Sequence, residues 1–381
     1  MNKKTIIMLL ILGILLLLPI VTTDNFFPLE VGDFKNDVAR AEQTMIGGDV
    51  NDFSNHYPGR TIMAYVVGGI SSMTGISCTY IQFVINYLAL LTSCLMIYLI
   101  VAKLFGALSG IVSIFLVMFC SHGIAKLFHA GDIWNIIVVC LLLIPALHFL
   151  AKWLTIHKRS HLIHALLLLA MFSSIHALAL VLPYILGAFF GCYIIYLLIK
   201  RQYKNARNIC LLLAGIVTGN FILSYIFIQD TLGFHYTLIT GNSLPGMADH
   251  PIIYYGERIV VGFGTLLIEY ITIPMVGILT ILATVWFNVK EKIVLSVEHK
   301  WFLALLISFI IPLVVASMIS NSFTPERHAL NASMLLAIAT GCIVGLVMQK
   351  YKSWKINCLI MGTACLGIIP SIIIWLSANS R

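Results

Sequence analysis

Seven carboxylates crowd into one short stretch of the chain, directly after its first hydrophobic segment. A carboxylate held beside an acceptor hydroxyl can act as a general base, which accelerates a reaction by about 10²–10⁴-fold. Asp33 and Asp37 are the candidates for this role, because they follow the hydrophobic segment closely enough to return to a bilayer surface. Any one acid in such a group is otherwise a solvated surface residue. The seven are Asp24, Glu30, Asp33, Asp37, Glu42, Asp49 and Asp52.

Four cations at predicted membrane boundaries could supply the complementary half of a site. Arginine and lysine donate charge-assisted hydrogen bonds to phosphate groups. A long basic side chain at a membrane boundary also extends toward lipid head groups with no further role, and this alternative stays open for each cation. The four are Arg60, Lys126, Arg258 and Arg327.

Histidines offer two further clusters. His129 and Asp132, in KLFHAGDIWN, could form a hydrogen-bonded acid and base couple, although Asp132 fits a helix N-cap equally well. His157, His161 and His164 have helical spacing but lie beside basic residues, so we interpret them as a solvated cluster rather than a metal site. The sequence indicates no metal site and no certain cofactor. A divalent metal is compatible with the acids but is not indicated.

The elements that must carry these side chains cross a membrane. Of the 381 residues, 60% are hydrophobic and only 10% are charged, whereas roughly a quarter of the residues in a soluble domain are charged. Apolar runs of about 20 residues, long enough to cross a bilayer core, recur along the chain. We predict an all-α polytopic transmembrane bundle that forms a single integral membrane domain, residues 1–381. Its eleven predicted spans are 5–22, 79–101, 105–125, 133–151, 162–177, 179–199, 208–228, 270–289, 301–320, 328–348 and 355–377.

The distribution of charge predicts the orientation of these spans. With a cytoplasmic N-terminus, sixteen of the 23 lysine and arginine residues fall on the cytoplasmic side, as the positive-inside rule requires. The formal net charge of +8 therefore reflects topology and indicates no nucleic-acid partner. Thirteen of the 15 acids fall on the other side. We predict a multi-pass protein of the plasma (inner) membrane whose active face is extracytoplasmic.

Two long extracytoplasmic loops are predicted, residues 23–78 and 229–269. The first begins with the acids and continues into TIMAYVVGGISSMTG, whose apolar residues are diluted by glycine and serine. We interpret this part as a helix that lies at the membrane interface. In the second loop, residues 259–269 are predicted to form another interfacial helix, because Glu269 at mid-membrane would cost several kcal/mol.

Three features of the chain together resemble a known family. They are an uncleaved first span, an acidic outer loop with an early aspartate, and the segment HYPGRTIMAYVVGGISSMTG before a many-span bundle. This layout resembles the GT-C superfamily of membrane glycosyltransferases. TPERHALNASMLLAIATG also resembles the late span of such enzymes, which often opens with an arginine close to a lipid phosphate. The resemblance implies interfacial helices and an essential aspartate in the first extracytoplasmic loop.

The resemblance implies a reaction as well. A sugar would move from a polyprenyl-phosphate donor to a glycan, lipid or protein acceptor, with inversion at the anomeric carbon. The membrane lipid would surround the protein. By position Asp33 corresponds to the catalytic aspartate, but Asp37 lies only four residues later, so the choice between them stays open. Arg327 corresponds to the arginine at the lipid phosphate. His56 and Tyr57 would hydrogen-bond sugar hydroxyls or line the acceptor path.

Two other functions fit the same layout. An O-antigen-type polymerase or ligase would use arginine and histidine in later loops, which makes Arg258, His235 and His250 its test residues. A transporter or flippase of a lipid-linked sugar would show charges buried within spans or paired broken helices. Glu269 and the region of Pro183 are the hints of such features in this chain.

Overall fold

A computed structural model shows a protein made of helices, and the described residues contain no strand. It describes residues 32–48, 58–120, 134, 137–173, 182–227, 260, 272–286, 294–319 and 325–351, together with 354, 355, 357, 358, 360 and 362. The α-helices are α2 (Gly32–Met45), α3 (Pro58–Thr74), α4 (Cys78–Phe105), α5 (Ala107–Phe115), α8 (Ile144–Ile156), α9 (Arg159–Ser173), α10 (Leu182–Ile199), α11 (Tyr203–Phe227), α14 (Thr272–Trp286), α15 (Val297–Ile319) and α16 (Pro325–Tyr351). Two π-helices, η2 (Leu116–Cys120) and η3 (Ile137–Leu143), complete the set.

Six helical segments within the described residues are long and apolar enough to cross a membrane. They are Cys78–Phe105, Ile137–Ile156, Leu182–Ile199, Tyr203–Leu223, Val297–Val314 and Leu330–Tyr351, and two shorter apolar helices cover Ala107–Met118 and Arg159–Ser173. The helical, membrane-type architecture predicted from composition is therefore confirmed. The number of eleven spans stays a prediction, because span 5–22 and most of span 355–377 lie outside the described residues.

The boundary between the second and third predicted spans differs from the sequence prediction. Helix α4 runs on to Phe105 instead of ending near residue 101. Lys103 lies in its last turn, where a cation complements the helix dipole. Gly106 then takes a φ of 96°, which ends α4 and lets α5 begin at the next residue.

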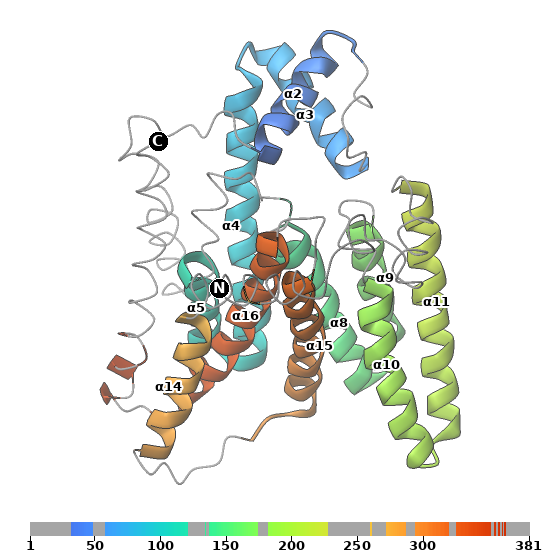
Figure 1. The fold of residues 1–381 in the computed structure, drawn as a ribbon, viewed down its shortest axis with the longest axis vertical. Helices are drawn as coiled ribbons and strands as arrows, with labels where there is room; N and C mark the ends of the chain where they lie inside the picture. Colours follow the sequence, from blue (N-terminus) through green and yellow to red (C-terminus); the bar gives the residue numbers. More distant parts are fainter. Residues whose placement is uncertain are drawn as a thin grey trace.

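Helices α2 and α3 form a hairpin at one end of the molecule, against the first part of α4 (Figure 1). Phe34, Val38 and Ala41 are spaced along one face of α2 and pack with Val67 of α3 and Ile81 of α4 in a small apolar core. The predicted helix within TIMAYVVGGISSMTG is confirmed as part of α3. Its position relative to a bilayer stays a prediction.

The centre of the bundle contains a very close helix pair, α5 with α16. A Cβ atom on Gly345 would lie 2.2 Å from Ser109 Cα, and one on Gly341 would lie 2.5 Å from Ser113 Cα. The two serine hydroxyls donate to backbone carbonyls of α16, Ser109 to Cys342 and Ser113 to Ile338, each at 3.3 Å. Small residues four apart on both helices allow this approach, which is a common way for membrane helices to associate.

Helices α9 and α11 are joined by a buried polar pair. Asn220 Nδ2 donates to Ser173 Oγ at 2.7 Å, and both side chains are buried. We expect Ser173→Ala to lower the free energy of unfolding by about 0.6–1.7 kcal/mol, because interhelical hydrogen bonds in membrane proteins contribute about this much. Thermal unfolding in detergent measures it. Asn205→Ala, which removes an exposed hydrogen bond to Gln202, is the control and should leave stability unchanged; equal effects of the two variants would contradict the prediction.

Candidate functional site

A buried ion pair lies on the hairpin helix that carries the acidic stretch. Asp37 and Arg40 are three residues apart on α2, and Arg40 Nη1 lies 3.4 Å from Asp37 Oδ1. Their exposed fractions are only 5% and 3%. Asp37 shares the inward face of α2 with Phe34, Val38 and Ala41, so the amphipathic pattern of the helix turns this carboxylate inward. Lys35 and Glu42, on the other face, are exposed.

Trp134 connects this ion pair to a second arginine. Its indole Nε1 donates to Asp37 Oδ2 at 2.6 Å, and the guanidinium carbon of Arg60 lies 5.2 Å from the centroid of the indole rings. Arg60 belongs to the first turn of α3, and both Arg60 and Trp134 are buried. One indole therefore contacts the carboxylate with its N–H edge and a cation with its face, which is the preferred geometry for each interaction.

Two π-helices flank the segment that carries Trp134. Helix η2 ends at Cys120, and η3 begins at Ile137. Short π-helical segments are rare and are frequently found at functional sites, because they redirect side chains out of the regular helical register. Both adjoin, along the chain, the segment whose Trp134 contacts Asp37.

The four side chains form a charged, largely dehydrated group that we call the Asp37 cluster: Asp37, Arg40, Arg60 and Trp134. It contains one carboxylate and two guanidinium groups. A carboxylate has about four acceptor positions, and Trp134 and Arg40 contact one oxygen each of Asp37. Guanidinium groups bind phosphate strongly in such surroundings. The cluster therefore combines a carboxylate, a group that can accept a proton, with two groups of the kind that bind phosphate.

The structure describes the side chains of only some of the predicted site residues. Asp37 and Arg60 come together through Trp134, as a shared site requires. Asp33 lies one turn before Asp37 in α2, and Arg327 lies in the first turn of α16, but their side chains are outside the description. The other predicted site residues lie outside the described residues altogether. They are His56, Tyr57, Lys126, His129, Asp132 and Arg258.

Two members of the cluster were missed by sequence reasoning. Arg40 lies three residues after Asp37, a spacing that brings side chains together on a helix, so helical periodicity could have found it. Trp134 is ninety-seven residues from its partner Asp37. A tryptophan in an apolar segment is usually a packing residue, and only tertiary structure identifies its hydrogen bond.

The indole N–H is expected to hold the carboxylate in place. Trp134→Phe keeps an aromatic face for Arg60 but removes the donor to Asp37 Oδ2. We expect the free energy of unfolding to fall by about 1–3 kcal/mol, the usual effect of leaving a buried polar group short of a partner. Thermal unfolding in detergent tests this, with Trp354→Phe as the control because Trp354 is exposed. A stability loss no larger than that of the control would contradict the role given to the indole.

Comparison with known proteins finds no family model that matches this chain and no matching curated protein. The interpretation of the Asp37 cluster therefore rests on its own chemistry.

Proposed function

We propose that the protein is a membrane glycosyltransferase that moves a sugar from a polyprenyl-phosphate donor to an acceptor hydroxyl. The observation that carries this proposal is the Asp37 cluster, in which the indole of Trp134 contacts a buried carboxylate and the buried Arg60, and a second buried arginine, Arg40, pairs with the same carboxylate. Sugar transfer from a lipid phosphate needs a proton acceptor and cations for the departing phosphate. The Asp37 cluster contains groups of both kinds, in a protein whose described helices include six long and apolar enough to cross a membrane.

In the proposed reaction, the acceptor oxygen attacks the anomeric carbon from the side opposite the phosphate. The bond between this carbon and the phosphate oxygen breaks, and the electron pair leaves with the lipid phosphate. Asp37 takes the proton of the acceptor hydroxyl, which keeps the attacking oxygen nucleophilic. Attack from the opposite side inverts the anomeric centre. The products are the glycosylated acceptor and the lipid phosphate monoester, to which the proton can finally pass.

Arginine side chains stabilise the charge that develops on the leaving phosphate. Arg60 is the described candidate, because its guanidinium lies over the same indole that binds Asp37. Arg327 and Lys126 are further candidates from the sequence. Phosphate is already a good leaving group, so the reaction requires no general acid.

The proposed function is tested with purified protein in liposomes and a panel of radiolabelled polyprenyl-phosphate sugars. The acceptors are the lipids and glycans extracted from the membranes of the native host. We expect label to move from one donor into a product that survives mild acid, with an equal amount of polyprenyl phosphate released. Liposomes without protein are the control. Release of polyprenyl phosphate from no donor in the panel would count against the proposal.

A further inference from the structure

Four helices bring charged side chains together at the end of the bundle that lies away from the α2–α3 hairpin. Lys103 lies near the end of α4, Lys152 near the end of α8, His161 in the first turn of α9 and Glu298 in the first turn of α15. The side chain of Lys152 lies near those of Lys103 and Glu298. His161 lies close to both Lys152 and Glu298. We call these four residues the Lys152 cluster.

Histidine and aromatic contacts hold two of these helix ends together. His299, the neighbour of Glu298, bonds through Nε2 to the carbonyl of Leu104 at 2.5 Å. Its ring also stacks on Phe105, with centroids 4.5 Å apart. The start of α15 is therefore attached to the end of α4, next to Lys103. Glu298 lies near the lysines because the contacts of His299 bring the start of α15 to the end of α4.

A second set of stacked rings positions α9. The ring of Phe149 in α8 stacks on His161 at 6.1 Å and on His164 at 5.0 Å, measured between centroids. Phe149 precedes Lys152 by three residues, so both lie toward the same side of α8. The first turn of α9 is thus held beside Lys152, and His161 belongs to the cluster by packing.

The charges of the cluster do not balance. Two ammonium groups lie near each other, and among the described residues Glu298 is the carboxylate near them. Long basic side chains at a membrane boundary can turn toward water and away from each other. Here they lie near each other although like charges repel, with Lys103 exposed to solvent and Lys152 half-buried. An anion between them would remove this repulsion.

Two buried polar atoms near the lysines make no hydrogen bond to any described residue. His148 has an exposed fraction of 5% and lies close to Lys152, Lys103 and His161. Within the described part of the chain, its Nδ1 makes no hydrogen bond, and neither does the buried Oε1 of Glu298. The lysines donate hydrogen bonds and the Glu298 carboxylate accepts them, so a ligand for this group must both accept and donate. A phosphate monoester that carries one proton can do both.

We propose that the Lys152 cluster binds a phosphate group, from a free phosphate or from the head group of an anionic phospholipid. The two lysines donate to the phosphate oxygens, and His161 adds a third donor when it is protonated. Glu298 accepts a hydrogen bond from the protonated phosphate oxygen. The site is separate from the Asp37 cluster, and the proposal does not depend on glycosyl transfer.

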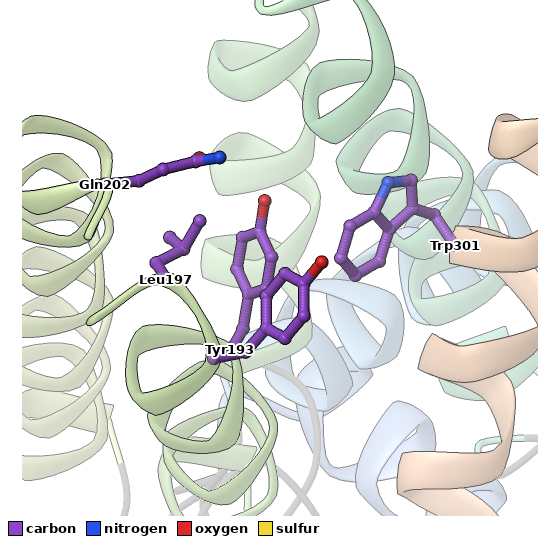
Figure 2. Close-up of a pocket in the computed structure, with 5 residues that line it drawn as sticks. Tyr193, Leu197, Gln202 and Trp301 are labelled. Atoms are coloured by element: carbon purple, nitrogen blue, oxygen red, sulfur yellow. The ribbon is translucent and has the colours of Figure 1, made fainter. Parts of the chain in front are cut away.

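An open pocket lined in part by α15, the helix that carries Glu298, favours a lipid as the source of the phosphate. The pocket has a volume of about 530 Å³ and is lined by Tyr193, Tyr196, Leu197, Gln202 and Trp301. Figure 2 shows the side chains of Tyr193 and Leu197 from α10, Gln202 from the connection to α11, and Trp301 from α15 around one space. Trp301 lies three residues after Glu298, so the pocket and the cluster share one side of α15.

The lining of this pocket suits the region where a head group joins its acyl chains. The rings of Tyr193 and Trp301 meet edge to face, 4.9 Å apart, and provide apolar surface. The tyrosine hydroxyls and the Gln202 amide provide hydrogen bonds next to that surface. Lys200, whose ammonium lies 6.0 Å from the ring of Tyr196, adds positive charge at the rim. Aromatic residues with nearby lysine are typical of the interfacial zone of a bilayer.

The first test uses inorganic phosphate and delipidated protein in detergent, with chloride at equal ionic strength as the reference. We expect phosphate to raise the unfolding temperature with a saturable dependence on concentration. Lys152→Gln and Lys103→Gln should each weaken this binding about tenfold or more, because each removes a hydrogen bond from a charged donor. In buffer without phosphate the two variants should be as stable as the wild type or more so, because they remove the repulsion between the lysines.

Lys204→Gln, at an exposed position of the same end, is the matched control and should bind phosphate like the wild type. A second arm distinguishes the sources by mass spectrometry of lipids retained from nanodiscs that contain phosphatidic acid and phosphatidylcholine. Selective retention of phosphatidic acid that is lost in Lys152→Gln identifies a lipid head group. Saturable phosphate binding without such retention identifies a free phosphate. Equal stabilisation by chloride, or equal phosphate binding in all three variants, would overturn the proposal.

Discussion

Asp37→Asn is expected to reduce sugar transfer by about 10²–10⁴-fold while the protein still folds. The substitution keeps the size and shape of the side chain, which is buried and bonded to Trp134. It removes the ability to take a proton from the acceptor. Asp33→Asn, one turn earlier on α2, is expected to retain transfer. Initial rates with the donor that the wild type uses, at matched protein amounts, measure both variants.

Loss of the Asp37 charge also leaves Arg40 without its carboxylate, 3.4 Å away, and this could lower stability by itself. The double variant Asp37→Asn with Arg40→Gln separates the two effects, because it removes both charges of the pair. We expect the double variant to recover the unfolding temperature of the wild type but no transfer. If transfer returns together with stability, the Asp37–Arg40 ion pair serves only to hold the α2–α3 hairpin against the bundle. If Asp33→Asn is the inactive variant, Asp33 is the base instead.

Gly345→Val is expected to destabilise the bundle by about 3 kcal/mol or more, at the upper end of the usual effects of overpacking. A Cβ at this position would lie 2.2 Å from Ser109 Cα and 2.5 Å from the backbone nitrogen of the same residue. Both atoms belong to the backbone of α5, so no side-chain rotation relieves the clash. The two helices would have to separate, with loss of the hydrogen bond from Ser109 to Cys342.

The outcome is measured as the fraction of protein that elutes as a single species after detergent extraction, together with its unfolding temperature. Gly219→Val in α11 is the matched control, because a Cβ there meets nothing within 4 Å. We expect Gly345→Val to yield little folded protein and Gly219→Val to behave like the wild type. Equal yields would show that α5 and α16 are not in such close contact.

The sequence predicted the architecture well because hydrophobicity decides which segments of a chain can cross a membrane. Apolar runs long enough for a bilayer mark helices such as α4 and α10, and their signal does not depend on tertiary contacts. The same reasoning identified the helix within TIMAYVVGGISSMTG and selected Asp37 and Arg60 as candidates. It did not predict that α4 runs on to Phe105, because the positive φ of Gly106 that ends the helix is a single-residue effect that hydropathy does not register.

Only the tertiary structure decided which candidates meet. The indole of Trp134 binds Asp37 from a segment nearly one hundred residues away, and no local pattern encodes such a contact. The same holds for Lys103 and Lys152, which are 49 residues apart in the chain and which packing brings near each other. Sequence by itself determined that this is a helical membrane-type protein with seven of its 15 acids gathered between residues 24 and 52. Side-chain partnerships depend on distances between helices, and those are set by packing, as at Gly345 and Ser109.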